Sequence, residues 1–206
     1  MLHRLRQMFF PAQDSKSLRN RILTRYGDMV DLPEDVRLEN FDLEIRTLTP
    51  GKKRLIVSSG CVLSGRFVLE AEQSEIIIGA DTFIGGGLFI ALKKIEIGSD
   101  VMISWVCTIS DNDAHSLRSI ERKEDVKNWK KDLESGSPGK SKDWSTVKCL
   151  PVHIGNKSWI GFNSIVLKGV QLGQGCVVGA GSVVTTSFET NTVLAGNPAR
   201  SIKKTE

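Results

Sequence analysis

Histidine and paired cysteine are scarce in this sequence. Among 206 residues there are three histidines, His3, His115 and His153, and four cysteines. No cysteine belongs to a CxxC pair, and none shows metal-ligand spacing. We therefore expect no metal and no disulfide, and we interpret the cysteines as reduced structural thiols.

Long apolar runs are also missing. No run reaches the roughly 18 residues that a membrane-spanning helix needs. The start, MLHRLRQMFFPAQDSK, is basic but lacks the continuous apolar region of a secretory signal, so the sequence predicts a cytoplasmic protein. Aromatic residues make up 6% and do not alternate with basic residues as base-stacking platforms require, so we expect no nucleic-acid partner.

Positive charge is concentrated in two segments, although the formal net charge is only +4. Residues 1–26 hold six Arg or Lys against one acid, and residues 116–153 hold nine against six. Such clusters are typical of solvated faces. They are also compatible with an anionic cofactor, a glycan or peripheral association with a membrane surface.

A six-residue repeat dominates the second half of the chain. Aliphatic residues recur without a slip at Ile154, Ile160, Val166, Leu172, Val178 and Val184. Glycine follows at 155, 161, 173 and 179, and a small or β-branched residue takes the fifth place of each hexad. The same frame appears earlier from Ile78, and again from Ile97 after one inserted residue.

This period indicates stacked coils of short β-strands. Six residues match neither the 3.6-residue period of a helix nor simple strand alternation. If each hexad forms one flat side of a coil, the aliphatic column builds a continuous core that no single repeat could bury alone. We expect the glycines to occupy tight corners at positive φ.

The interruptions of the repeat predict the domain organisation. We assign residues 1–50 to a basic N-terminal helix and lead-in, and 51–115 to the first coils. An inserted loop is expected over 116–153, further coils over 154–190, and a C-terminal tail over 191–206. The segment SKSLRNRILTRYG is the expected helix, and the first half of the insertion has helix-compatible charges.

The frame [LIV]-G-x-x-[small]-x, together with the run from VHIGNKSWIG to AGNPARSIKK, closely resembles the hexapeptide-repeat acyltransferases. The resemblance covers about residues 56–204. It implies that the all-β solenoid is a left-handed parallel β-helix, assembled as a homotrimer. It also implies acetyl transfer from acetyl-CoA. None of these points follows from the period itself.

The resemblance gives His115 a role. A histidine in a loop leaving the coils, in an Asp-rich context such as SDNDAHS, is the general base in such acyltransferases. A sugar hydroxyl needs such a base because its proton must leave as it attacks a thioester. Asp111 or Asp113 is expected to orient the imidazole, and the sequence does not choose between them. His153 is interpreted as a residue at the edge of a coil.

The resemblance also implies a donor groove between subunits. Backbone contacts to acetyl-CoA are expected at Phe162, Ala180 and Thr185, with Trp159 as a wall and Arg200 and Lys203 near the phosphates. Phe162 replaces a small residue of the family, and Thr186 stands where lysine is common.

The insertion is expected to select the acceptor, and it resembles the branch that O-acetylates capsular or lipopolysaccharide sugars. Its residues Ile120, Val126, Trp129 and Leu133 form a candidate packing face, and Trp129 and Trp144 are candidates for stacking on sugar rings. The alternatives are N-acetylation of an amino sugar or nucleotide sugar and a non-catalytic scaffold. A zinc hydratase of the same fold is disfavoured, because it needs three clustered histidines.

Overall fold

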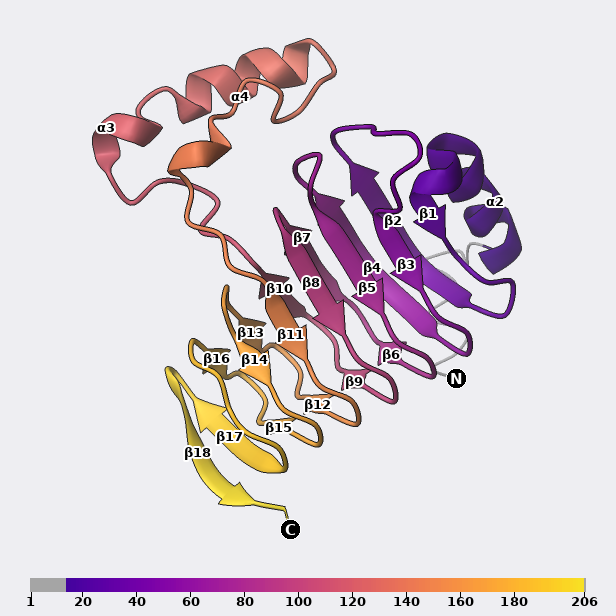
Figure 1. Cartoon of the computed structure of the whole chain (residues 1–206), viewed down its shortest axis with the longest axis vertical. Helices are drawn as coiled ribbons and strands as arrows, with labels where there is room; N and C mark the ends of the chain where they lie inside the picture. The colour runs from indigo at the N-terminus through magenta and orange to yellow at the C-terminus, as the bar shows by residue number, and fades with distance from the viewer. Residues whose placement is uncertain (1–13, 206) are drawn as a thin grey trace, which may run out of the picture.

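A helix covers the beginning of the β-structure. The structure, a computed structural model, describes residues 14–205, so His3 and the start of the chain lie outside the described residues. Helix α2 (Ser15–Tyr26) buries Leu18, Ile22 and Tyr26, and the Tyr26 hydroxyl donates to the Leu43 carbonyl at 2.9 Å. Turn η1 (Gly27–Met29) follows. The predicted basic helix is therefore present, packed on the end of the coils (Figure 1).

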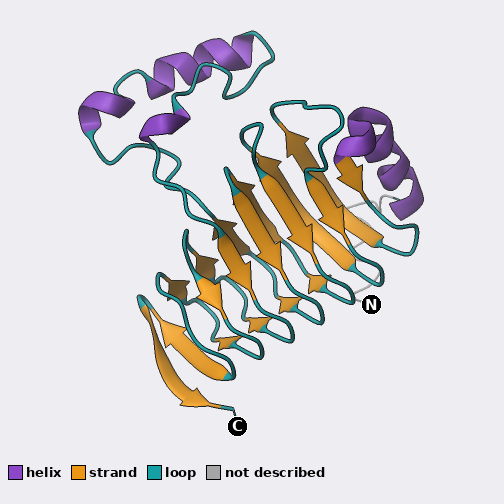
Figure 2. Cartoon of the chain, in the orientation of Figure 1, coloured by secondary structure: helices purple, strands orange, loops and turns teal. Residues whose placement is uncertain are grey.

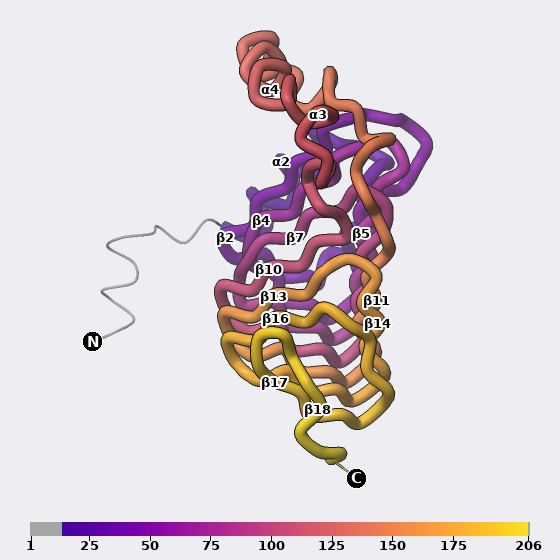
Figure 3. The backbone as a smooth tube through the Cα atoms, turned by 90° about the vertical axis from the view of Figure 1, so that its left-hand side faces the viewer, coloured from indigo at the N-terminus to yellow at the C-terminus, as the bar shows by residue number. Residues whose placement is uncertain are grey.

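The strands stack in parallel on three faces of a coil, as Figures 1 and 3 show. Face 1 holds β1 (Val30–Asp31), β3 (Leu55–Val57), β5 (Glu75–Ile78), β8 (Lys94–Ile97), β11 (Val152–Ile154) and β14 (Gln171–Leu172). Face 2 holds β6 (Phe83–Ile84), β9 (Met102–Ile103), β12 (Trp159–Ile160), β15 (Val177–Val178) and β17 (Thr192–Gly196). Face 3 holds β7 (Gly87–Ala91), β10 (Cys107–Ser110), β13 (Ile165–Val166) and β16 (Val183–Val184).

Longer strands mark both ends of the stack. β4 (Val62–Leu69) pairs with β6 and then with β7, and β2 (Arg37–Ile45) runs parallel beside it. β18 (Ala199–Lys204) pairs antiparallel with β17. Coil structure thus begins at Val30, inside the segment predicted to be a lead-in, and the predicted C-terminal tail contains a hairpin. Among the described residues, no helix has both the length and the apolar character to cross a membrane.

The aliphatic column forms the core. All six repeat positions from Ile154 to Val184 are at most 1% exposed, and Ile78, Ile97 and Ile103 are buried equally well. The fifth places Ser158, Ser164, Val170, Cys176 and Ser182 are also buried. Both inward positions of the hexad are therefore confirmed. The four cysteines are free thiols, and burial raises the pKa of Cys149 to about 12.

Glycine is required at the repeat positions for a different reason from the one predicted. The backbone angle φ is not positive at Gly155, Gly161 or Gly173. They are needed because the next coil passes too close: a Cβ on Gly161 would lie 2.6 Å from the Ala180 amide nitrogen. Positive φ occurs two residues later in the hexad, as at Asn163 and Gly181. The prediction of positive φ at the glycines that follow the aliphatic residues was therefore wrong.

Candidate active site

The insertion leaves the coils after β10 and returns at β11 without disturbing their register. Its neck is closed by an antiparallel bridge between Asn112 and Cys149, and the Leu150 N–H donates to the Asp111 carbonyl at 2.8 Å. β11 then pairs with β8 as the next coil should. The insertion contains α3 (Ser119–Arg122), α4 (Asp125–Glu134) and η2 (Trp144–Thr146), which stand off the coils (Figure 2).

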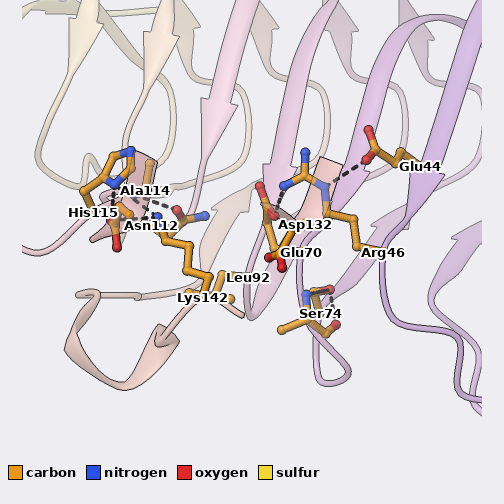
Figure 4. Close-up of polar contacts among 12 residues, drawn as sticks. Glu44, Arg46, Glu70, Ser74, Leu92, Asn112, Ala114, His115, Asp132 and Lys142 are labelled. Carbon is orange, nitrogen blue, oxygen red and sulfur yellow. Dashed lines mark hydrogen bonds and ion pairs between the residues drawn. The ribbon is translucent and has the colours of Figure 1, made fainter. Parts of the chain in front are cut away.

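Arg46 at the end of β2 connects the coils with the insertion. Its guanidinium lies over the Trp129 ring of α4 at 4.7 Å, a favourable cation–π distance. The same guanidinium pairs with Glu44 and Glu70, as Figure 4 shows. Burial raises the pKa of Glu70, which Arg46 partly opposes.

Only one member of the predicted packing face packs on the coils. Trp129 is half-buried under Arg46, whereas Ile120, Val126 and Leu133 are 60%, 80% and 54% exposed. The apolar positions of this segment therefore do not form a single buried stripe in the described chain.

A short turn presents His115 to solvent. Ala114 has a φ of 59°, and its N–H donates to the Asn112 side-chain oxygen at 2.8 Å. The Asn112 amide in turn donates to Asp111 at 2.9 Å. The His115 side chain remains 53% exposed at the end of this chain of contacts (Figure 4). The turn can therefore offer one edge of the imidazole to another molecule.

Asp111 and Asp113 do not contact the imidazole. The buried carboxylate of Asp111 accepts the backbone N–H groups of Leu92, Lys93 and Lys94 at 2.7, 2.7 and 2.6 Å. Burial raises the pKa of Asp111, and these N–H donors oppose the rise. Asp113 instead pairs with Lys168 on the coils.

The acid beside His115 is Asp125, the first residue of α4. Its Oδ2 contacts His115 Nδ1, and Lys142 Nζ lies 3.2 Å from the same oxygen and 3.1 Å from Nδ1. Burial would raise the pKa of Asp125, but the hydrogen bonds from His115 and Lys142 outweigh it and lower the pKa. The carboxylate is thus retained until the pH falls below the ordinary range of an aspartate. No motif or spacing in the sequence marks Asp125.

The predicted donor-binding residues lie on other parts of the coils. Phe162 and Ala180 occupy one corner in successive coils, together with Trp105, between faces 2 and 3. Trp159 lies on β12, 48% exposed, with its indole N–H donating to Ser104 Oγ at 3.3 Å.

The remaining predicted donor-binding positions and the predicted base, His115, lie at other places on the chain. Thr185 follows β16 at the corner between faces 3 and 1, the same corner at which the insertion leaves β10. Arg200 and Lys203 are exposed on β18. Within residues 14–205, no contact joins His115 to any of these side chains.

His153 is an exposed residue of β11, and its Nδ1 lies 3.9 Å from Glu96 on the neighbouring coil. It lies between Glu96 and Gln171 in the outward row of face 1. In the described part of the chain, no three His, Cys, Asp or Glu side chains gather as a candidate metal site.

Comparison with known proteins shows which proteins this chain is similar to. Residues 151–186 match the model described as the hexapeptide repeat of succinyl-transferase. Escherichia coli WbbJ, whose name assigns it O-acetyl transfer in lipopolysaccharide biosynthesis, is 35% identical over 114 residues. Residues 151–186 thus carry a hexapeptide repeat, and the chain is similar to acetyltransferases that contain it. The WbbJ match covers 55% of this chain and 52% of WbbJ, about half of each.

Two solved acetyltransferases have a fold similar to that of this chain. The polySia-specific acetyltransferase NeuO matches with a TM-score of 0.64 and 25% identity over 85% of this chain and 71% of NeuO. An acetyltransferase of Vibrio cholerae, complexed with acetyl-CoA, matches with a TM-score of 0.59 and 21% identity over 94% and 80% of the two chains.

Proposed function

We propose that this protein transfers an acetyl group from acetyl-CoA to a hydroxyl group of a glycan or glycan precursor, as a homotrimer of left-handed β-helices. The observation that carries the proposal is the exposed imidazole of His115, contacted at Nδ1 by Asp125. This contact orients the ring and leaves Nε2 available as a base.

The proposed reaction moves one proton through His115. Nε2 accepts the proton of the acceptor hydroxyl while its oxygen attacks the thioester carbonyl carbon. Asp125 keeps the other ring proton on Nδ1 and so holds Nε2 toward the acceptor during this step. When the tetrahedral intermediate collapses, the C–S bond breaks and the imidazolium returns the proton to the leaving thiolate. The products are the acetyl ester and free CoA, so atoms and charge balance.

The exposed residues on the coils fit the donor. Trp159 and Phe162 are 48% and 61% exposed apolar surfaces, suited to the pantetheine arm. Arg200 and Lys203 supply positive charge for phosphate groups. The Trp159 and Phe162 surface lies on another side of the coil from His115, so a second copy of the chain is needed to bring donor and base together. This separation supports the trimer.

The insertion supports a glycan acceptor. It carries His115 and its partners, so whatever molecule contacts it also meets the base. WbbJ and NeuO are both named for acetylation of saccharide polymers or their precursors. Trp129 and Trp144 already contact Arg46 and Lys142, and only their remaining surface is open to a sugar ring.

The test is thiol release from acetyl-CoA with a panel of sugar acceptors that includes amino sugars, confirmed by the mass gain of one acetyl group. His115→Ala should reduce the rate by roughly 10²–10⁴-fold, the usual contribution of a positioned base. CoA affinity, measured by calorimetry, should be unchanged.

The matched control is His153→Ala, which removes an exposed imidazole from β11 outside the proposed machinery. It should acetylate at the wild-type rate. An unchanged rate for His115→Ala with the true acceptor would refute the general-base mechanism. Product formed only with amino sugars would favour N-acetylation, and absence of both CoA binding and product would favour a scaffold.

A further inference from the structure

Lys142 has an unusual position for a lysine of an exposed insertion. Its side chain is only 10% exposed. The ammonium group lies 5.0 Å from the centre of the Trp144 ring, and it also contacts Asp125. The preceding residue, Ser141, is fixed by hydrogen bonds of its N–H and hydroxyl to Asp132, at 2.8 and 2.6 Å. The ammonium group is therefore held in place and partly shielded from solvent screening.

The chemistry of the three groups limits where the protons are. A carboxylate has no donor, so the contact between Asp125 Oδ2 and His115 Nδ1 requires a proton on Nδ1. An ammonium group has no acceptor, so Lys142 donates to Asp125 rather than receiving from the ring. Its charge nevertheless lies 3.1 Å from Nδ1.

We infer that Lys142 is a positioning residue for His115: it neutralises Asp125, so that Asp125 fixes the ring without holding it as an imidazolium. This inference rests on the proposed function of His115. A lone carboxylate favours the charged ring, which cannot accept a proton. With Lys142 present, the pair adds no net charge beside the imidazole, so the contact that orients the ring does not favour its charged form.

The other charged groups around the loop are already engaged. Asp113 is paired with Lys168, and Glu121 with Arg118. Arg122 donates to the carbonyls of Ser116 and Leu117. Asp143 accepts from Ser145, and Glu70 from Arg46. Removal of Lys142 therefore changes the charge beside the His115–Asp125 pair more directly than removal of any of these other groups.

The experiment compares Lys142→Met, Lys142→Arg and Asp125→Asn by NMR titration of the histidine rings, with His153 as an internal control. In Lys142→Met the His115 signal should titrate at higher pH than in the wild-type protein. In Asp125→Asn it should titrate at lower pH, and Lys142→Arg should restore the wild-type position. This readout needs neither acceptor nor acetyl transfer, so it can fail independently of the proposed function.

The rate profile provides the second readout. At pH 6 Lys142→Met should be about 3–10-fold slower than the wild-type protein, and at pH 8.5 within about twofold, because the base itself is intact. A titration of His115 that is unmoved or moves downward in Lys142→Met overturns the inference. An equal loss of rate at every pH, without a shift, assigns Lys142 a purely structural role and also overturns it.

Discussion

Asp111 stabilises the turn that carries His115 rather than the imidazole itself. Replacement by alanine leaves the N–H groups of Leu92, Lys93 and Lys94 without their acceptor inside the protein. Buried donors without partners are costly, so Asp111→Ala should lower the free energy of unfolding by about 3 kcal/mol. Thermal denaturation followed by circular dichroism should show a melting temperature lower by about 10 °C.

The matched variant is Asp113→Ala, two residues along the same loop. It removes a partly exposed ion pair with Lys168, which contributes less than about 1 kcal/mol. Equal destabilisation by the two variants would contradict the structural role assigned to Asp111.

At the scale of single residues, the acid that contacts His115 could not be predicted from the sequence. His115 itself could be singled out, because it stands where the repeat stops and because the family resemblance gives such a histidine a role. Asp111 and Asp113 were candidates through nearness in sequence alone. Their carboxylates are engaged by backbone N–H groups and by Lys168, and the carboxylate that reaches the ring is that of Asp125, at the start of α4. Contacts that help to place α4, such as that of Arg46 with Trp129, follow no period.

At the scale of the coil, two glycines of the same corner test two different constraints. Gly161→Ala places a Cβ 2.6 Å from the Ala180 amide nitrogen of the next coil, so the backbones must separate. Gly181→Ala meets no atom within 4 Å but keeps a φ of 69°, which costs roughly 1–2 kcal/mol for a residue with a Cβ. We expect Gly161→Ala to lose more stability than Gly181→Ala in urea denaturation. The reverse order would contradict the close-approach explanation.

The regular elements follow from the repeat, and the irregular ones do not. Each hexad between Ile154 and Val184 supplies two buried positions, which is sufficient to specify a strand and its register. β1 and β2 were not predicted, because residues 30–45 carry no six-residue pattern. β2 alternates buried and exposed residues beside β4 and includes a register shift between Leu38 and Phe41.

For the whole molecule, the three faces of the coil differ in chemistry. The outward positions of face 2 are Phe83, Met102, Trp159, Val177 and Val193. Face 3 presents Leu88, Thr108, Ile165 and Val183. Face 1 presents Ile56 and Ile77 in its first coils and the polar residues Glu96, His153 and Gln171 in the coils that follow. Two different apolar faces that meet at one corner are what a head-to-tail contact requires, and such a contact repeats until a ring closes.

We therefore expect light scattering to give three chain masses for the protein, and Met102→Glu to break the ring. Met102 is 55% exposed on face 2, and a carboxylate there would be buried without a partner in the assembly. Because the side chain points away from the aliphatic column, the separated chain should keep its circular dichroism spectrum. Gln171→Glu, the same new side chain on the polar part of face 1, should leave the trimer intact. Loss of the trimer in both variants, or in neither, would contradict the assignment of face 2 to the interface. If the Met102→Glu monomer also binds CoA as tightly as the wild-type protein, the donor groove does not need a second copy, and the intersubunit site fails with it.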